Sequence, residues 1–204
     1  MAVTRSPFVD RLSGWGIYVI GVVPAVASFW LGATGGLGAD PVRSFEQTLG
    51  LWALRFLILT LAVTPLRELA GVNLLRFRRA LGLLAFWYAA MHFTVYLTLD
   101  RGLLWDTIIP DIVRRPFITL GFAALMLLVP LAVTSNRLSI RRLGKNWRRL
   151  HKLIYVAATL AVLHYLLATK VLDPTQVVHI GLVALLLGYR LVRGFVRRPA
   201  RRAA

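Results

Sequence analysis

The sequence predicts an all-α integral membrane protein, a bundle of six transmembrane helices. Of its 204 residues, 58% are hydrophobic and only 16% are charged, whereas a typical soluble domain carries about 25% charged residues. The apolar residues gather into six runs, each close to the length of about 20 residues that crosses a bilayer as a helix. We expect a single domain over residues 1–204, with a short basic tail from about residue 197. The six runs occupy residues 14–31, 48–66, 80–99, 117–133, 150–168 and 177–196.

Basic residues at the ends of these runs predict how the helices are oriented. Arginine and lysine are concentrated between the second and third runs, between the fourth and fifth, and after the sixth. Such segments stay in the cytoplasm. The opposite connections hold most of the acidic residues, although they also contain Arg43, Arg101 and Lys170. We therefore expect a multi-pass protein with both termini in the cytoplasm. Its net charge of +17 then reflects topology and contact with membrane lipid, and no binding to nucleic acid is expected.

Two histidines lie at matching depths in the third and fifth runs, which both start at the cytoplasmic side. His92 follows Arg79 by thirteen residues, and His164 follows His151 by thirteen. At about 1.5 Å per residue, each lies about 20 Å along its helix axis. Imidazole is an axial ligand of haem iron, and the sequence contains no cysteine that could supply a thiolate. The pair predicts a low-spin haem b, held between the third and fifth helices and suited to electron transfer.

His151 lies at the cytoplasmic start of the fifth run, beside Arg148 and Arg149. Thirteen steps of about 100° place it roughly 140° away from His164 around an ideal helix, so the two share a face only if the helix bends. His151 could ligate a second haem, but the start of the third run offers Arg78 instead of a histidine. A flavin or quinone site on the same basic rim is the alternative, and the residues leave both open.

Two further polar residues lie within the second and sixth runs. Arg55 is deep in the second run, and no acidic residue is found at a comparable depth. Because an unpaired charge is costly inside a membrane, we expect a partner. A haem propionate would serve, and a backbone carbonyl or a water-filled cavity is the alternative. His179 opens the sixth run on the outer side, and we expect an interfacial residue that extends toward the lipid headgroups.

Several motifs are distributed over the length of the predicted membrane core. They are GLWALR at 50–55, TPLR at 64–67, RRALGL at 78–83 followed by His92 and Asp100, SIRRLG at 139–144, and WRRLH at 147–151 followed by His164 and Tyr165. In combination they resemble the MsrQ family, formerly YedZ, of the ferric-reductase-like transmembrane superfamily. His92, His151 and His164 match the functional histidines of that family, whereas His179 matches none.

The resemblance implies a haem b subunit of the bacterial inner membrane. Such a subunit supplies electrons to MsrP, a periplasmic molybdenum-cofactor enzyme that reduces methionine sulfoxide in oxidised proteins. The family also implies FMN as a cofactor, and a cytoplasmic flavin reductase or a membrane quinone as the electron donor. Electrons would enter at the cytoplasmic face, where basic side chains attract an anionic flavin or an acidic reductase. These side chains are Arg141, Arg142, Lys145, Arg148 and Arg149.

Two other classes of function remain open on the sequence. A self-contained transmembrane reductase would pass electrons directly to ferric chelates or to oxygen, but the relatives that do so use a flavin and nicotinamide domain that these 204 residues do not contain. A haem-free transporter or assembly factor is the other class. A reducible b-type spectrum would exclude the haem-free class, and reoxidation by the periplasmic molybdoenzyme would separate the first two.

Overall fold

The computed structural model describes the backbone of residues 7–169 and 171–196, and the side chains from residue 15 onward. Within these residues, six helical segments are long and apolar enough to cross a membrane, which confirms the predicted fold class. The basic tail expected from about residue 197 lies outside the described residues. The six spans are Trp15–Ala33, Pro41–Leu69, Leu75–Asp100, Pro116–Val133, Lys145–Leu167 and Pro174–Val196.

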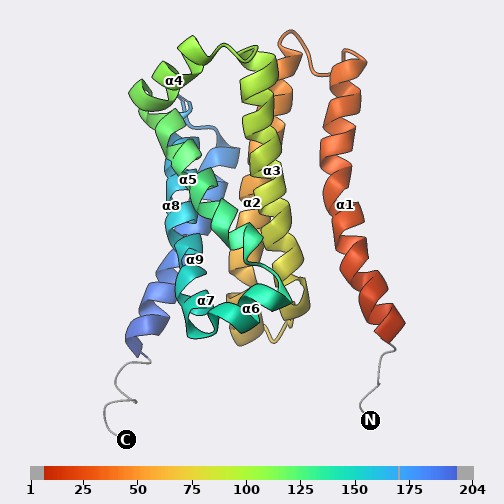
Figure 1. Cartoon of the computed structure of the whole chain (residues 1–204), viewed down its shortest axis with the longest axis vertical. Helices are drawn as coiled ribbons and strands as arrows, with labels where there is room; N and C mark the ends of the chain where they lie inside the picture. Colours follow the sequence, from red (N-terminus) through yellow and green to blue (C-terminus); the bar gives the residue numbers. More distant parts are fainter. Residues whose placement is uncertain (1–6, 170, 197–204) are drawn as a thin grey trace, which may run out of the picture.

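The helices run up and down through one bundle (Figure 1). Its long helices are α1 (Pro7–Ala33), α2 (Pro41–Leu69), α3 (Arg78–Val95), α5 (Pro116–Val133), α8 (Leu153–Leu167) and α9 (Pro174–Val196). Shorter elements connect them: a 3₁₀ turn (Leu75–Phe77), a π-helical turn (Tyr96–Asp100), α4 (Trp105–Arg114), α6 (Arg137–Leu143) and α7 (Lys145–Leu150). The first described residues of α1 and the last of α9 lie at the same end as α6 and α7, which we call the basic end; α4 lies at the other end, the α4 end.

Four helices form a ring that surrounds the centre of the bundle. The closest packing is within the pairs α2 with α3 and α5 with α8, and α3 also packs on α5 and α2 on α8. Helices α3 and α8 therefore occupy diagonal corners of the ring. Helix α9 packs outside the ring on α2 and α8, and α1 packs outside it on α2 and α3. This arrangement brings side chains of α3 and α8 toward a shared space.

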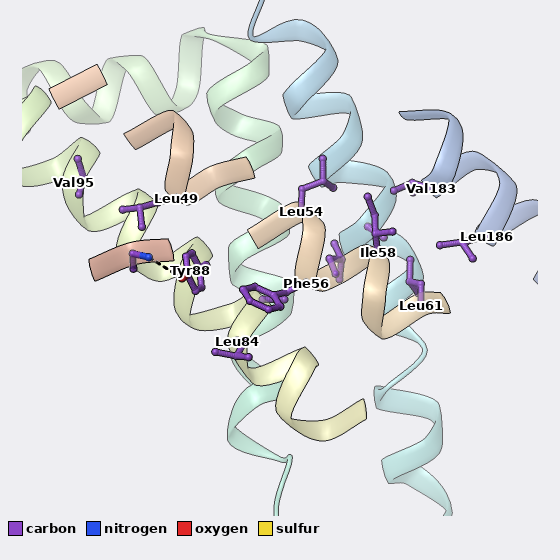
Figure 2. Packing of buried hydrophobic residues seen from close by; sticks show 14 residues of the cluster. Leu49, Leu54, Phe56, Ile58, Leu61, Leu84, Tyr88, Val95, Val183 and Leu186 are labelled. Atoms are coloured by element: carbon purple, nitrogen blue, oxygen red, sulfur yellow. Dashed lines mark hydrogen bonds between the residues drawn. The ribbon is translucent and has the colours of Figure 1, made fainter. Parts of the chain in front are cut away.

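Helix α2 carries much of the apolar core. Its start is fixed by Asp40, whose carboxylate accepts a hydrogen bond from the backbone N–H of Arg43 at 3.0 Å, with Pro41 in the first turn. Its buried side chains meet α3 on one side and α9 on the other (Figure 2). In a membrane, such close packing is itself a main source of helix association, because lipid is as apolar as the core. The buried side chains drawn from α2 include Leu49, Leu54, Phe56, Ile58 and Leu61.

Helix α1 is joined to α3 by one tyrosine and one glycine. The hydroxyl of Tyr88 donates to the carbonyl of Gly21 at 2.6 Å. It also accepts from the N–H of Ala25 at 3.0 Å (Figure 2). These are the two partners of one helical hydrogen bond, so the hydroxyl bridges a turn of α1 next to Pro24. Gly21 allows this approach, because a Cβ there would lie 2.5 Å from a methyl carbon of Leu84.

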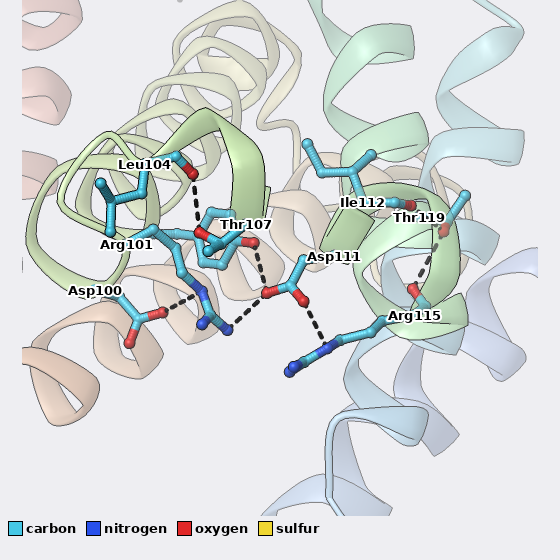
Figure 3. A network of polar contacts seen from close by, with 9 residues as sticks. Asp100, Arg101, Leu104, Thr107, Asp111, Ile112, Arg115 and Thr119 are labelled. Carbon is cyan, nitrogen blue, oxygen red and sulfur yellow. Dashed lines mark hydrogen bonds and ion pairs between the residues drawn. The ribbon is translucent and has the colours of Figure 1, made fainter. Parts of the chain in front are cut away.

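A buried carboxylate organises the α4 end (Figure 3). Asp111 of α4 is 8% exposed; Arg101 Nη2 and Arg115 Nε each lie 2.8 Å from its carboxylate, and the hydroxyl of Tyr96 donates to it at 3.3 Å. Burial acts to lower the pKa of Arg101, but Asp111 and Asp100 outweigh it and raise that pKa above its ordinary value. Arg101 therefore stays cationic, and its ion pair with Asp111 fixes α4 against the end of α3.

At the basic end, two short helices cross beneath the ring. Asn136 caps α6 by accepting from the N–H of Ser139 at 2.8 Å. The chain then turns into α7 at Gly144, whose φ of 49° favours glycine. Nearby, Glu68 of α2 pairs with Arg193 of α9 at 2.5 Å. Arginines of α6 and α7 are left exposed at this end.

We predict that Gly21→Ala destabilises the protein relative to Gly16→Ala. Both changes replace a glycine of α1, and each gains up to about 1 kcal/mol of helix propensity. A Cβ at Gly16 meets nothing within 4 Å, whereas at Gly21 it collides with Leu84. Overpacking of this kind costs about 1–3 kcal/mol. Thermal unfolding in detergent should rank Gly16→Ala above Gly21→Ala; equal melting temperatures would show that α1 does not depend on this contact.

Candidate functional site

The structure brings His92 of α3 and His164 of α8 together in the centre of the ring. Their ring centroids are 6.1 Å apart, and the ring planes are inclined by 68°. Both residues lie toward the α4 end of their helices, His92 one turn before the π-helical turn and His164 one turn before the end of α8. Counting residues from the charged ends of the two helices predicted that both histidines lie at the same depth. In the structure their side chains meet across the diagonal of the ring of helices.

Each histidine is held by a backbone carbonyl of a neighbouring helix. His92 Nδ1 lies 2.8 Å from the carbonyl oxygen of Glu46 on α2, and His164 Nδ1 lies 2.6 Å from that of Phe117 on α5. A carbonyl can only accept, so Nδ1 carries the proton in both rings. In the neutral form of each ring Nε2 is therefore the unprotonated nitrogen, and this is the nitrogen that can ligate a metal.

The spacing of the two rings fits one metal ion between them. A bond from a transition metal to an imidazole nitrogen is about 2 Å long, and the ring centre lies about 1 Å beyond that nitrogen. Two imidazoles on opposite sides of an ion therefore have centres about 6 Å apart, as His92 and His164 do. Among the described residues, no group of three or more His, Cys, Asp or Glu could hold a metal ion by itself. Two imidazole donors fit an iron whose other ligands come from a porphyrin.

Two glycines make room for these histidines. A Cβ on Gly50 of α2 would lie 3.1 Å from Nδ1 of His92, and a Cβ on Gly121 of α5 would lie 2.8 Å from Nδ1 of His164. Both are glycines because the rings lie directly against the backbone. The sequence analysis did not identify these glycines as site residues. The signal that could have found them is that each lies in an apolar run whose helix packs against a helix with a buried histidine.

Glu46 is a further residue that sequence analysis missed. Besides offering its carbonyl, it places its Oε1 atom 3.9 Å from His92 Nε2. It lies in the second turn of α2 and not in the loop before it, because Asp40 and Pro41 start the helix earlier than the apolar run does. An acidic group therefore lies beside the histidine pair.

His151 lies apart from this pair, in the turn between α7 and α8 at the basic end. Its ring stacks on Trp147 at 3.9 Å between centroids. The hydroxyl of Thr134 gives its one proton to the carbonyl of Pro130 at 2.6 Å, so it accepts from His151 Nε2 at 3.0 Å. Nε2 of His151 is thus engaged as a donor. The chain turns between α7 and α8, so His151 does not continue the helix that carries His164. None of the other three histidines lies beside His151.

Arg55 contacts His179. This contact corrects the expectation for His179 and gives Arg55 a partner that the sequence did not indicate. Arg55 Nε donates to His179 Nε2 at 3.3 Å, and its guanidinium carbon lies 4.8 Å from the centroid of the Trp52 ring. His179 is only 9% exposed, and its Nδ1 donates to the carbonyl of Thr175 at 2.6 Å. The expectation that His179 extends to the headgroups is wrong, because packing of α9 on α2 turns it inward. For Arg55, the partner is a neutral imidazole that the sequence did not indicate.

The basic residues expected at a flavin or quinone site lie away from the histidine pair. Arg148 and Arg149 are exposed on α7, as are Arg141 and Arg142 on α6 and Lys145 at the start of α7. They form the surface of the basic end and are not part of the space between α3 and α8. We call these five residues the basic cluster.

Comparisons with known proteins identify related sequences. Residues 49–162 match the family model described as ferric reductase like transmembrane component. That segment includes His92 and His151 and ends two residues before His164. The match covers more than half of the chain.

Whole proteins with similar sequences come from Brucella. The chain is 59% identical over 200 residues to proteins of Brucella ovis, Brucella canis and Brucella suis named "Protein-methionine-sulfoxide reductase heme-binding subunit MsrQ", with 97% of this chain and 91% of each relative covered. No solved structure matches the chain. At this identity and coverage, the chain belongs to the MsrQ family, within the ferric-reductase-like transmembrane components.

Proposed function

We propose that this chain is the haem-binding membrane subunit of a protein-methionine-sulfoxide reductase. In this role it carries electrons across the bacterial inner membrane to MsrP, the periplasmic molybdenum-cofactor enzyme that repairs methionine sulfoxide in oxidised proteins. The observation that carries the proposal is the pair His92 and His164, with ring centroids 6.1 Å apart and both Nδ1 protons donated to backbone carbonyls. The name of the Brucella relatives, a heme-binding subunit of a protein-methionine-sulfoxide reductase, supports it.

The proposal assigns one haem b to this pair. His92 and His164 would hold it, and it would supply a one-electron redox centre; with both imidazoles as ligands, no position would remain for oxygen or substrate. The chain's own residues hold the two rings in one tautomer and one orientation, because each Nδ1 is committed to a carbonyl. A second haem at His151 is not proposed, since its Nε2 already donates to Thr134 and no histidine faces it from α3.

The basic end is the proposed side of electron entry. With the positive end in the cytoplasm, the basic cluster faces the electron donor, a flavin reductase or a quinone, and an FMN bound there would find cations for its phosphate. His151 and Trp147 form a stacked pair beside this cluster, and we propose that His151 serves the flavin or quinone site. The α4 end then faces MsrP, and the nearby histidine pair is placed for electron exit.

Arg55 is the proposed partner of a haem propionate. It lies five residues after Gly50 on α2, or about 7.5 Å along the helix from the glycine that contacts His92. Its neighbour His179 in turn contacts the ring of Tyr165, which follows His164 in the chain, at 6.4 Å between centroids. The imidazole of His179 is neutral, because one nitrogen donates and the other accepts. The charge of Arg55 is therefore not neutralised by that contact.

The function is tested by electron flow from the purified protein. Haem in the purified chain is reduced chemically under anaerobic conditions and mixed with oxidised MsrP and a methionine sulfoxide substrate. We expect reoxidation that depends on MsrP. Equally fast reoxidation by ferric chelates or by oxygen, with no effect of MsrP, would instead indicate a self-contained reductase.

Removal of either axial histidine should abolish the low-spin haem. His92→Ala and His164→Ala each leave the iron with one imidazole, so the strong axial field is lost. His151→Ala is the matched control and should keep the low-spin spectrum of the wild type. Absorption and electron paramagnetic resonance spectra of the three variants decide the assignment. A His92→Ala protein with a wild-type spectrum and full haem content would contradict it.

Neutralising the basic cluster should slow reduction by the donor while leaving the haem spectrum intact. Replacing its five residues by glutamine removes the positive potential that steers an anionic partner. The association rate with a cytoplasmic flavin reductase should fall about tenfold or more at low salt, and its dependence on salt should weaken. The measurement is stopped-flow reduction over a range of ionic strengths. Rates equal to those of the wild type at low ionic strength would exclude this entry surface.

Arg55→Leu should lower the midpoint potential of the haem. A positive charge beside a propionate favours the reduced, more electron-rich form, so its removal favours the oxidised form. Arg55→Lys keeps the charge and should stay close to the wild type. His179→Ala removes the contact to Arg55 but keeps the charge of Arg55, so it should shift the midpoint less than Arg55→Leu does. Redox titration of the three purified variants compares them. An unchanged midpoint in Arg55→Leu at full haem occupancy would remove the propionate role.

A further inference from the structure

The two histidines are held by the same local arrangement on two different helices. On α2, the carbonyl of Glu46 accepts from His92, and Gly50 follows four residues later; on α5, the carbonyl of Phe117 accepts from His164, and Gly121 follows four residues later. We call each of these a glycine–carbonyl pair. We propose that Gly50 and Gly121 are positioning residues that set the tautomer and the basicity of the axial histidines, an inference that rests on the proposed haem site.

Helix geometry explains why glycine stands at these two positions. The carbonyl of residue i accepts from the N–H of residue i+4, which here is the glycine itself. A carbonyl oxygen has a second lone pair, and this is the one that receives the imidazole Nδ1–H. The Cα–Cβ bond in a helix points toward the preceding turn. A side chain at i+4 would therefore project over the carbonyl and cover the position of the imidazole.

The distances show that the two positions differ in how strictly they need glycine. A Cβ on Gly121 would lie 2.8 Å from Nδ1 and 2.9 Å from Cε1 of His164, separations that require the ring to move. A Cβ on Gly50 would lie 3.1 Å and 3.2 Å from the same atoms of His92, which is tight but closer to tolerable. The ring atoms that collide are the hydrogen-bonding Nδ1 and its neighbour Cε1. Either ring can therefore move away from the added Cβ only by lengthening its hydrogen bond to the carbonyl.

The consequence for the metal follows from the role of that hydrogen bond. Donation from Nδ1 to a carbonyl fixes Nε2 as the ligating nitrogen and makes the imidazole a stronger donor to the metal. A stronger donor favours ferric iron and lowers the midpoint potential. The glycine–carbonyl pairs belong to α2 and α5, the helices that pack most closely on the ligand-bearing helices α3 and α8. Helix packing in each half of the ring therefore tunes one axial ligand.

The test uses Gly121→Ala and Gly50→Ala in the full-length, haem-loaded protein, with Gly82→Ala as the matched control. Gly82 lies on α3 itself, and a Cβ there meets only Thr60 at an ordinary 3.7 Å. We expect Gly121→Ala to weaken haem affinity about 10- to 100-fold, as loss of an outer-shell contact to a metal ligand typically does. Haem that remains should show a higher midpoint potential and altered low-spin resonances. Gly50→Ala should show the same changes to a smaller extent, and Gly82→Ala none.

The outcomes separate this inference from the function on which it rests. A low-spin haem in the wild type, with unchanged affinity and midpoint potential in Gly121→Ala and Gly50→Ala, would overturn the positioning role and leave the haem site standing. Absence of low-spin haem from the wild type would overturn both. If Gly121→Ala does not fold, judged by its melting temperature without haem, then Gly50→Ala decides through its potential. A shift of equal size in Gly82→Ala would show that the effect is not specific to the glycine–carbonyl pairs.

Discussion

The hydrogen bonds from His92 and His164 to the carbonyls of Glu46 and Phe117 are the contacts on which the account depends. Imidazoles within a membrane are costly unless their polar atoms are satisfied. Here one nitrogen of each ring is satisfied by the backbone of a neighbouring helix, which leaves the other free to bind a metal. The same two bonds require α2 to approach α3 and α5 to approach α8, and these are the most closely packed helix pairs of the bundle.

The rest of the bundle supports this arrangement from both ends. At the α4 end, Asp111 binds Arg101, Arg115 and Tyr96, so the segment that follows His92 is joined to the start of α5. At the basic end, Glu68 and Arg193 join α2 to α9. Helix α1 lies outside the ring and is connected through the hydroxyl of Tyr88. The histidine pair is thus surrounded by helices whose ends are fixed by polar contacts and whose middles are apolar.

Much of the fold could be predicted from the sequence, because helix length and the placement of charge are properties of single segments. The depth count for His92 and His164 also succeeded, since rise per residue is constant in a helix. Contacts between helices could not be predicted in this way. Gly50, Gly121 and the carboxylate of Glu46 matter only through the helix they face, and His179 is buried only because α9 packs on α2. The proton donation from His151 to Thr134 likewise depends on α5 meeting the turn before α8.

The central claim is that one iron lies between His92 and His164, and quantifying and characterising the haem of the purified wild-type protein tests it most directly. The measurement combines the haem content per chain with the electron paramagnetic resonance spectrum of the ferric form. The account predicts one haem b per chain, six-coordinate and low-spin with two imidazole ligands. A high-spin iron that binds added ligands at an open position, or a purified, folded protein without haem, would contradict it.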